Sequence, residues 1–382
     1  MPYEISFDRP PHGCVLSAVR KGEKAKVAFM EFSSSEDGDR FIQRLDGLAS
    51  TIIAKLPPEA RIRPSIIDHL LAIIRKDGTA TVYVNEVGVI QTFRAKRSLA
   101  QGEPLYDDDI ADIYSHRFQD IEIPSSAGFL YVFSVGWRKG LYYDFSPTLP
   151  DAVSGRSYDV EVLLAQLYTY LRFQDLFKIS EREWDSLFKQ SWFPFVSLNR
   201  DTIREILNYN RNFWNVDELL PRVAAELEQR VTKMTEGFSS NPFLAPHQNL
   251  IAKAVERYLE GDHISAISIL YPRIEGVMRS IHMGGHPADR VSQRSLVDST
   301  VDSGATMRHD YSLLMPEKFR RYLSEVYFAN FDPNKAAPLS RHTVAHGVAD
   351  ATDFSLKGST LGFLVLDQLF YLLPPQANTD TS

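Results

Sequence analysis

The stretch His263-Ile-Ser-Ala-Ile-Ser-Ile-Leu-Tyr-Pro-Arg-Ile-Glu-Gly-Val-Met-Arg-Ser-Ile-His282 decides the fold of the C-terminal part of the chain. Its apolar residues recur at three- and four-residue spacing, which is the period of a helix with one buried face. They are Ile267, Leu270, Ile274, Val277, Met278 and Ile281. We therefore expect a long helix that packs its apolar face against other helices.

Further helices are predicted on both sides of this stretch. Gln248–Leu259 precedes it and ends at Gly261, where a glycine can stop a helix. After a mixed segment, 283–315, that we interpret as an insertion, helices are expected at Glu317–Phe328, around Arg341 and at Thr360–Leu373, before Pro374-Pro375. Residues 245–375 are thus predicted to form an all-α domain.

The N-terminal part has a different pattern. Residues 1–150 are predicted as a small α+β domain, with a strand at 26–32, helices at 35–56 and 65–76, and two hairpins, 79–84 with 89–93 and 129–137 with 141–145. A linker at 147–157 leads to a helical middle region, 151–236, and Gly237–Pro246 reads as a domain boundary. The expected fold class is an α+β N-terminal region followed by mostly α structure.

Aromatic residues are dense in the helical middle region. Such residues could stack on nucleic acid bases, but Phe and Trp at helical spacing more often fill the seams between helices. We expect the second arrangement.

Composition narrows the classes of function. The 382 residues contain one cysteine, Cys14, which excludes an intramolecular disulfide and a four-cysteine zinc site. The formal net charge of −7 argues against a protein that coats nucleic acid through bulk charge. No apolar window reaches the length of a membrane span, so we expect a cytoplasmic protein without secretion or membrane insertion. The sequence contains no P-loop, dinucleotide-binding or nucleophile-elbow motif. It therefore gives no support for P-loop nucleotide hydrolysis, dinucleotide redox chemistry or α/β-hydrolase activity.

The segment Pro338-Leu-Ser-Arg341-His342-Thr-Val-Ala-His346-Gly347 carries the residues best suited to chemistry. Arginine offers a planar fork of donors to a phosphate, and histidine can give and take a proton near neutrality. Ser340 or Asn334 can cap a short helix that Gly347 ends. On that helix His342 and His346 share a face, whereas Arg341 lies about 140° from His346 and must reach round.

The Arg-His-x-x-x-His-Gly segment, the polar loop after it and the final apolar helix resemble the end of the HEPN superfamily (higher eukaryote and prokaryote nucleotide-binding domains). The resemblance covers roughly residues 240–375 and implies that 245–375 form an all-α antiparallel HEPN-like helical bundle. It implies a metal-independent endoribonuclease with no cofactor, in which Arg341, His342 and His346 occupy the motif positions. RNA is the implied substrate, and a homodimer with a composite site is the implied assembly.

Glu275 falls on the margin of the apolar stripe of the long helix, where a carboxylate is partly buried and needs a partner. The resemblance implies that Glu275 orients Arg341 or His346. A purely structural salt bridge is equally compatible with this position. A cleft that also gathers Arg273, Arg279 or Arg321 would be locally positive.

The implied reaction uses His346 to remove the proton of a ribose 2′-OH, a second imidazole to protonate the leaving 5′-oxygen, and Arg341 to hold the phosphate. Products are a 2′,3′-cyclic phosphate and a 5′-OH. Residues 1–236 would select the substrate or keep the nuclease silent, as in toxin-like and defence-associated HEPN proteins.

Two alternatives stay open. The first is a catalytically silent HEPN-like binding or scaffold protein, in which Arg341 and His346 would be buried or lie unpaired on an open face. The second is a zinc site made of His282 and His286 with His342 and His346. The metalloprotease pattern needs a glutamate directly after the first histidine, and Thr343 stands there instead.

Overall fold

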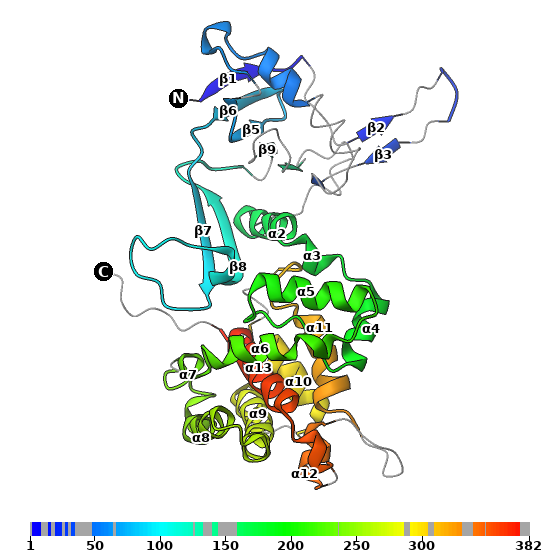
Figure 1. Cartoon of the computed structure of the whole chain (residues 1–382). Coiled ribbons are helices and arrows are strands. Elements are labelled where there is room, and N and C mark those ends of the chain that lie inside the picture. The colour runs from blue at the N-terminus through cyan, green and yellow to red at the C-terminus, as the bar shows by residue number, and fades with distance from the viewer. Residues whose placement is uncertain are drawn as a thin grey trace. The chain divides into compact units, whose positions relative to one another are not determined.

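The computed structural model describes residues 2–8, 14–16, 20–24, 27–29, 32–34, 48–63, 66–124, 127–132, 140–143, 159–235, 237–285, 291–304, 309–330, 339–347 and 349–374. The chain divides into two compact units (Figure 1). The first comprises Met1–Thr92 and Ile113–Gln174, and the second comprises Phe93–Asp112 and Asp175–Ser382.

The first unit is built on a six-stranded antiparallel sheet with the strand order β1-β6-β5-β9-β10-β4. The strands are β1 (Tyr3–Ser6), β4 (Phe32–Ser34), β5 (Leu70–Ile74), β6 (Thr79–Val84), β9 (Gly128–Val132) and β10 (Gly140–Tyr143). Two further pairs are β2 (Cys14–Leu16) with β3 (Val27–Phe29), and β7 (Val89–Ala95) with β8 (Ile110–Phe118). The β7–β8 ribbon contributes residues to both units.

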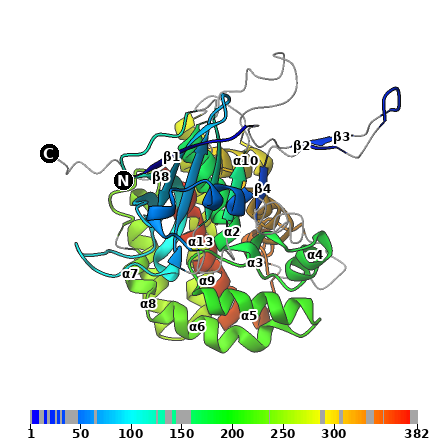
Figure 2. The same cartoon turned by 90° about the horizontal axis from the view of Figure 1, so that it is seen from above.

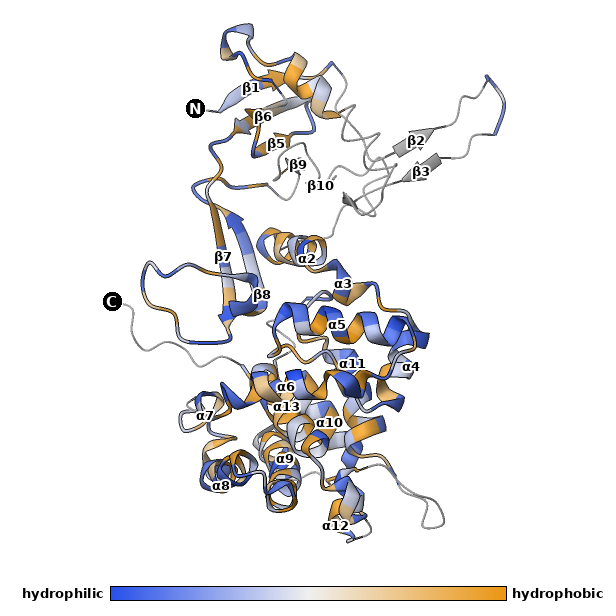
Figure 3. Ribbon diagram, in the orientation of Figure 1, coloured by the Kyte–Doolittle hydropathy of each residue, from blue (hydrophilic) through white to orange (hydrophobic). Residues whose placement is uncertain are grey.

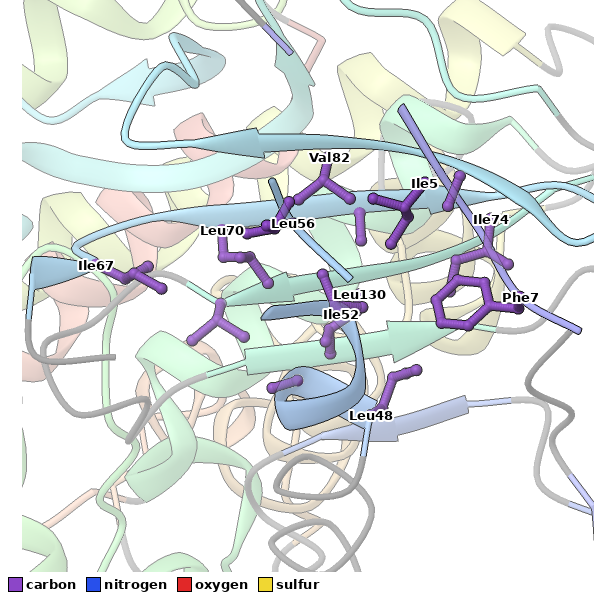
Figure 4. Close-up of a cluster of buried hydrophobic side chains, with 14 residues drawn as sticks. Ile5, Phe7, Leu48, Ile52, Leu56, Ile67, Leu70, Ile74, Val82 and Leu130 are labelled. Carbon is purple, nitrogen blue, oxygen red and sulfur yellow. The ribbon is translucent and has the colours of Figure 1, made fainter. Parts of the chain in front are cut away.

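Strand β5 is buried on both faces of the sheet. Leu70, Ala72 and Ile74 point into a cluster with the helix at residues 48–54, and Figure 4 shows Leu48 and Ile52 of that helix beside the sheet. Leu71 and Ile73 point to the other face, where α2 (Val160–Arg172) buries leucines against the sheet. Burial on both faces explains why β5 is apolar at every position.

This double burial corrects the helix predicted at 65–76. Its apolar residues fit a helical period, but they also form the continuous apolar run of a strand covered on both sides, and the structure has β5 there. The predicted hairpin of 79–84 with 89–93 is also wrong. Both strands exist, but β6 pairs with β1 and β5, whereas β7 pairs with β8. The β5–β6 turn holds Asp77-Gly78, a hairpin signal that we missed, with Gly78 at φ +86°.

Other predictions for this part agree with the structure where it describes the chain. The predicted pairing of 129–137 with 141–145 is confirmed by β9 and β10. The strand expected at 26–32 overlaps β3 and the first residue of β4. Of the helix expected at 35–56, residues 48–54 are helical and 35–47 lie outside the described residues, as does the linker at 147–157.

The second unit is mostly helical, so the expected order of a sheet region followed by helices is confirmed. Its α-helices are α4 (Glu181–Lys189), α5 (Arg200–Arg211), α6 (Leu220–Glu228), α7 (Val231–Met234), α8 (Gln248–Leu259), α9 (His263–Gly285), α10 (Gln293–Asp302), α11 (Pro316–Tyr322), α12 (Arg341–Ala345) and α13 (Leu356–Leu372). A short α3 (Gln174–Phe177) spans the division between the units, and α11 continues as a π-helix, Leu323–Tyr327. Helices such as α4 and α5 carry both hydrophilic and hydrophobic residues, as Figure 3 shows.

Helix α13 is the centre of the second unit. Nearly all of its residues are buried, and it packs against α9, α6 and α10 (Figures 1 and 2). The buried side chain of Gln368 accepts a hydrogen bond from the Val196 N–H at 3.0 Å and donates to the Leu314 carbonyl at 2.9 Å. Arg94 donates to the carbonyls of Phe370, Tyr371 and Leu373 at the C-terminal end of α13, where the hydrogen bonds of the helix run out.

The two helical regions that we expected on either side of Gly237–Pro246 share one core. The ring of Phe238 packs against that of Phe370 of α13 with centroids 5.5 Å apart and planes inclined by 43°, and Arg230 lies 3.4 Å from the carboxylate of Asp367. Residues 175–235 and 237–374 therefore belong to the same unit.

The aromatic residues of the helical middle region fill its core, as expected. Trp184, Trp192, Phe193 and Phe195 are buried, whereas Phe213 and Trp214 are exposed. None of the helices in the described part of the chain combines the length and apolar character needed to cross a lipid bilayer.

Glycines let α13 approach α9 closely. A Cβ added at Gly362 would lie 2.8 Å from Cδ2 of Leu270 and 3.0 Å from Cε2 of Tyr271, which are buried residues of α9. One at Gly358 would meet Leu339, Ile267 and the Asp353 carbonyl at 3.2 Å or less. A side chain at either position would therefore require its neighbours to shift.

We expect Gly362→Ala to lower the free energy of unfolding by about 1–3 kcal/mol, because the added methyl overpacks the α9–α13 contact. Urea unfolding measures the change. Gly285→Ala is the control, since nothing lies within 4 Å of a Cβ at that helix end. Equal stability of the two variants would contradict the close packing.

Candidate functional site

The short helix α12 is fixed at its start by side chains. Ser340 accepts a hydrogen bond from the Thr343 N–H at 3.2 Å, and its own N–H donates to the Thr343 hydroxyl at 2.8 Å. Both residues are buried, and Ser340 also donates to the Ala329 carbonyl. Gly347 ends the helix at φ +66°. Of the two caps that the sequence allowed, the structure uses Ser340, and the predicted stop at Gly347 is confirmed.

A pocket of about 340 Å³ lies between α9, α10 and α12. Its charged and amide-bearing lining consists of Glu275 and Arg279 from α9, Gln293 from the start of α10, and Arg341, His342 and His346 from α12 and its C-terminal cap. The four residues that the sequence predicted for the site are therefore brought together in one pocket. Arg321 does not line it, because it pairs with carboxylates elsewhere.

The carboxylate of Glu275 joins two arginines. Its Oε1 accepts hydrogen bonds from Nε and Nη2 of Arg279, at 2.9 and 2.7 Å. Its Oε2 lies 2.6 Å from Nε of Arg341 in an ion pair, although this Nε makes no hydrogen bond of good geometry. The side chains of Glu275 and Arg341 are only 14% and 19% exposed. Breaking such a partly buried pair leaves an uncompensated charge, so the pair fixes where the Arg341 guanidinium lies.

The imidazoles of His342 and His346 lie beside each other, as their four-residue spacing predicted. Their ring centroids are 6.1 Å apart and the planes differ by 13°. The side-chain amide of Gln293 donates to Nε2 of His342, which places the proton of the neutral ring on Nδ1. His346 is exposed at the end of α12, so solvent reaches it.

The surroundings of His342 favour its neutral form. Burial lowers its pKa below the ordinary value, and the positive charges of His346 and Arg341 lower it further, whereas Glu275 acts in the opposite direction. The neutral form of His342 therefore predominates near neutral pH.

Tyr327 lies behind the ion pair, in the π-helix that follows α11. Its hydroxyl donates to the Tyr271 carbonyl at 2.6 Å, and the charges of Arg341 and Glu275 both act on it. Burial raises the pKa of Tyr327, so the phenol stays protonated and can keep this hydrogen bond. A π-helix is uncommon and is often found near functional sites.

Sequence reasoning assigned no role to Gln293 or Tyr327. It treated 283–315 as an insertion, yet α10 forms inside this segment and builds one wall of the pocket. The only signal for its start was Ser292 three residues before Ser295, a weak version of a capping box.

The alternative zinc site is not assembled by the described histidines. His282 is buried and its Nδ1 is 2.8 Å from the Ser299 hydroxyl, and it does not line the pocket of His342 and His346. His286 lies outside the described residues. Within the described ranges, no group of three or more His, Cys, Asp or Glu side chains could hold a metal ion.

Comparisons of the chain with models of protein families, with curated proteins and with solved structures found no match. We therefore infer its function from the side chains of this pocket and their geometry.

Two substitutions should move the pKa of His342 in opposite directions. Arg341→Gln removes a positive neighbour and should raise it, whereas Glu275→Gln removes the negative neighbour and should lower it further. Titration of the imidazole ¹⁵N signals by NMR measures both and also reports the tautomer. Arg257→Gln on α8, outside the pocket, is the matched control. Shifts in the same direction, or none, would contradict the geometry around His342.

Proposed function

We propose that this protein is a metal-independent endoribonuclease of the HEPN type that cleaves RNA to 2′,3′-cyclic phosphate and 5′-OH ends. The observation that carries the proposal is the single pocket lined by Arg341, His342, His346 and Glu275. A guanidinium and two imidazoles are the groups that phosphodiester cleavage by a ribose 2′-OH requires.

The chemical steps can be assigned to these side chains. His346 removes the proton of the 2′-OH, and the 2′-oxygen attacks the adjacent phosphorus. The bond from phosphorus to the 5′-oxygen breaks, and a second imidazole gives its proton to that oxygen. The Arg341 guanidinium offsets the negative charge that builds on the phosphate, and Glu275 keeps the guanidinium in place.

His342 is the second imidazole in this assignment. Its lowered pKa makes the imidazolium a stronger acid, which helps it protonate a poor leaving group, although a smaller fraction is protonated at neutral pH. Gln293 holds the ring by Nε2, the nitrogen that contacts the amide. The leaving oxygen would either displace this amide or approach through Nδ1.

The pocket favours the nuclease over the silent scaffold, the alternative with the same fold. A scaffold was expected to bury Arg341 and His346 or to leave them unpaired on an open face. Instead, His346 is exposed and Arg341, though mostly buried, faces the same pocket and is paired with Glu275. Paired and oriented groups around a hollow are what a substrate needs.

We expect the purified protein to cleave a labelled pool of total RNA in EDTA and to leave cyclic-phosphate ends. His346→Ala and Arg341→Ala should each reduce the rate by about 10²–10⁴-fold, because each removes a group that acts in the transition state. Arg257→Ala is the control for loss of an ion-paired arginine outside the pocket. Cleavage that survives in both pocket variants, or no cleavage by a folded protein, would favour the scaffold.

The proposal includes a homodimer in which two pockets form a composite site. The mass in solution should then be 2 × 43.4 kDa, about 87 kDa, by light scattering. Activity per chain should fall on dilution as the dimer dissociates. A species of 43.4 kDa that keeps full activity at every dilution would contradict the composite site.

A further inference from the structure

The arginines of the second unit differ in how fully carboxylates neutralise them. Arg320 contacts Asp298, Asp302 and Glu317, and Arg321 contacts Glu181, Asp185 and Glu325. Each of these guanidiniums therefore meets three carboxylates. Arg279 and Arg341, in contrast, share the one carboxylate of Glu275.

The pocket is consequently positive within an acidic chain. Among the described residues that line it, Glu275 is the one carboxylate, against two guanidiniums. The chain as a whole carries a formal charge of −7. Charges in a partly desolvated pocket act more strongly than the same charges on an open surface, so this excess attracts an anion.

Arg279 is placed to contact such an anion at the mouth of the pocket. Its side chain is 51% exposed, compared with 19% for Arg341. Two of its nitrogens, Nε and Nη2, are fixed by Glu275, and Nη1 makes no hydrogen bond to any residue in the described part of the chain. A guanidinium whose one edge is hydrogen-bonded keeps a fixed orientation, and its other edge can donate hydrogen bonds to a phosphate.

We propose that Glu275 holds Arg279 and Arg341 as a paired cation site for two neighbouring phosphates of a single RNA strand. Arg341, the deeper of the two, binds the phosphate that is cleaved, and Arg279 binds the next phosphate along the strand. The site thus selects a single-stranded stretch with at least two phosphates over a lone phosphate ester. This inference rests on the proposed function in taking RNA as the ligand.

The test measures binding without cleavage. The probe is a short, fluorescein-labelled, single-stranded 2′-deoxy oligonucleotide, which has no 2′-OH to attack, and its anisotropy gives Kd over a series of NaCl concentrations. Arg279→Ala should weaken binding about tenfold at low salt. The logarithm of the association constant falls linearly with the logarithm of the NaCl concentration. Arg279→Ala should make this slope shallower by about 0.7, the value for one phosphate contact in single strands.

Two variants act as controls. Arg257→Ala removes an ion-paired arginine of similar exposure that does not line the pocket, and it should change neither quantity. Arg279→Lys keeps the charge, so it should restore the salt slope. If Arg279→Ala behaves like Arg257→Ala, Arg279 contacts no phosphate and the proposal is wrong.

Glu275→Gln separates positioning from bulk charge. It makes the pocket more positive, so a site that works by charge alone should bind the oligonucleotide more tightly and with a steeper salt slope. If Glu275 instead positions both arginines, binding should weaken in spite of the added positive charge. Tighter binding by Glu275→Gln would therefore overturn the paired site.

The binding result is independent of the nuclease. An Arg279 contribution to binding without any RNA cleavage would support the paired cation site and contradict the endoribonuclease. If cleavage depends on Arg341 and His346 but Arg279 contributes nothing to binding, the endoribonuclease would be supported and the paired cation site contradicted.

Discussion

The close approach of α9 and α13 is the constraint on which the second unit depends. Gly358 and Gly362 lie four residues apart, on one face of α13, and leave room for Ile267, Leu270 and Tyr271 of α9. The phenol of Tyr271 donates to the Gly358 carbonyl at 3.3 Å, across the same contact. α13 is buried on nearly all sides, so it fixes the position of α9 within the core.

The position of α9 in turn determines the pocket. Glu275 and Arg279 follow the Ile267–Tyr271 contact along the same helix, which carries them to the pocket. α12 has only five residues and could not hold its shape alone. Its Ser340 cap, its link to Ala329 and the Glu275–Arg341 pair attach it to the bundle. The site is thus built from one long, well-packed helix and one short helix held by polar contacts.

The sequence predicted the helices of the second unit better than the strands of the first. α8 was placed at its observed bounds and α9 differed only at its end, because an apolar face at helical spacing is unambiguous over many residues. β5 was mistaken for a helix because burial on two faces removes the alternation that marks a strand. Helical geometry predicted that His342 and His346 lie side by side, whereas the contact of Glu275 with Arg341 was expected only from the resemblance. Gln293 could not be foreseen, because only tertiary packing brings α10 to α12.

Charge distribution explains how an acidic chain can present a site for an anion. In the described part of the second unit, six acidic side chains form ion pairs with Arg320 and Arg321 alone, and charges paired in this way give no net attraction for a ligand. At the pocket, one carboxylate faces two guanidiniums, and the imidazole beside them is kept neutral by burial and by its positive neighbours. This excess of positive charge is confined to the pocket. It can hold a phosphate in one position without giving the whole surface an affinity for nucleic acid.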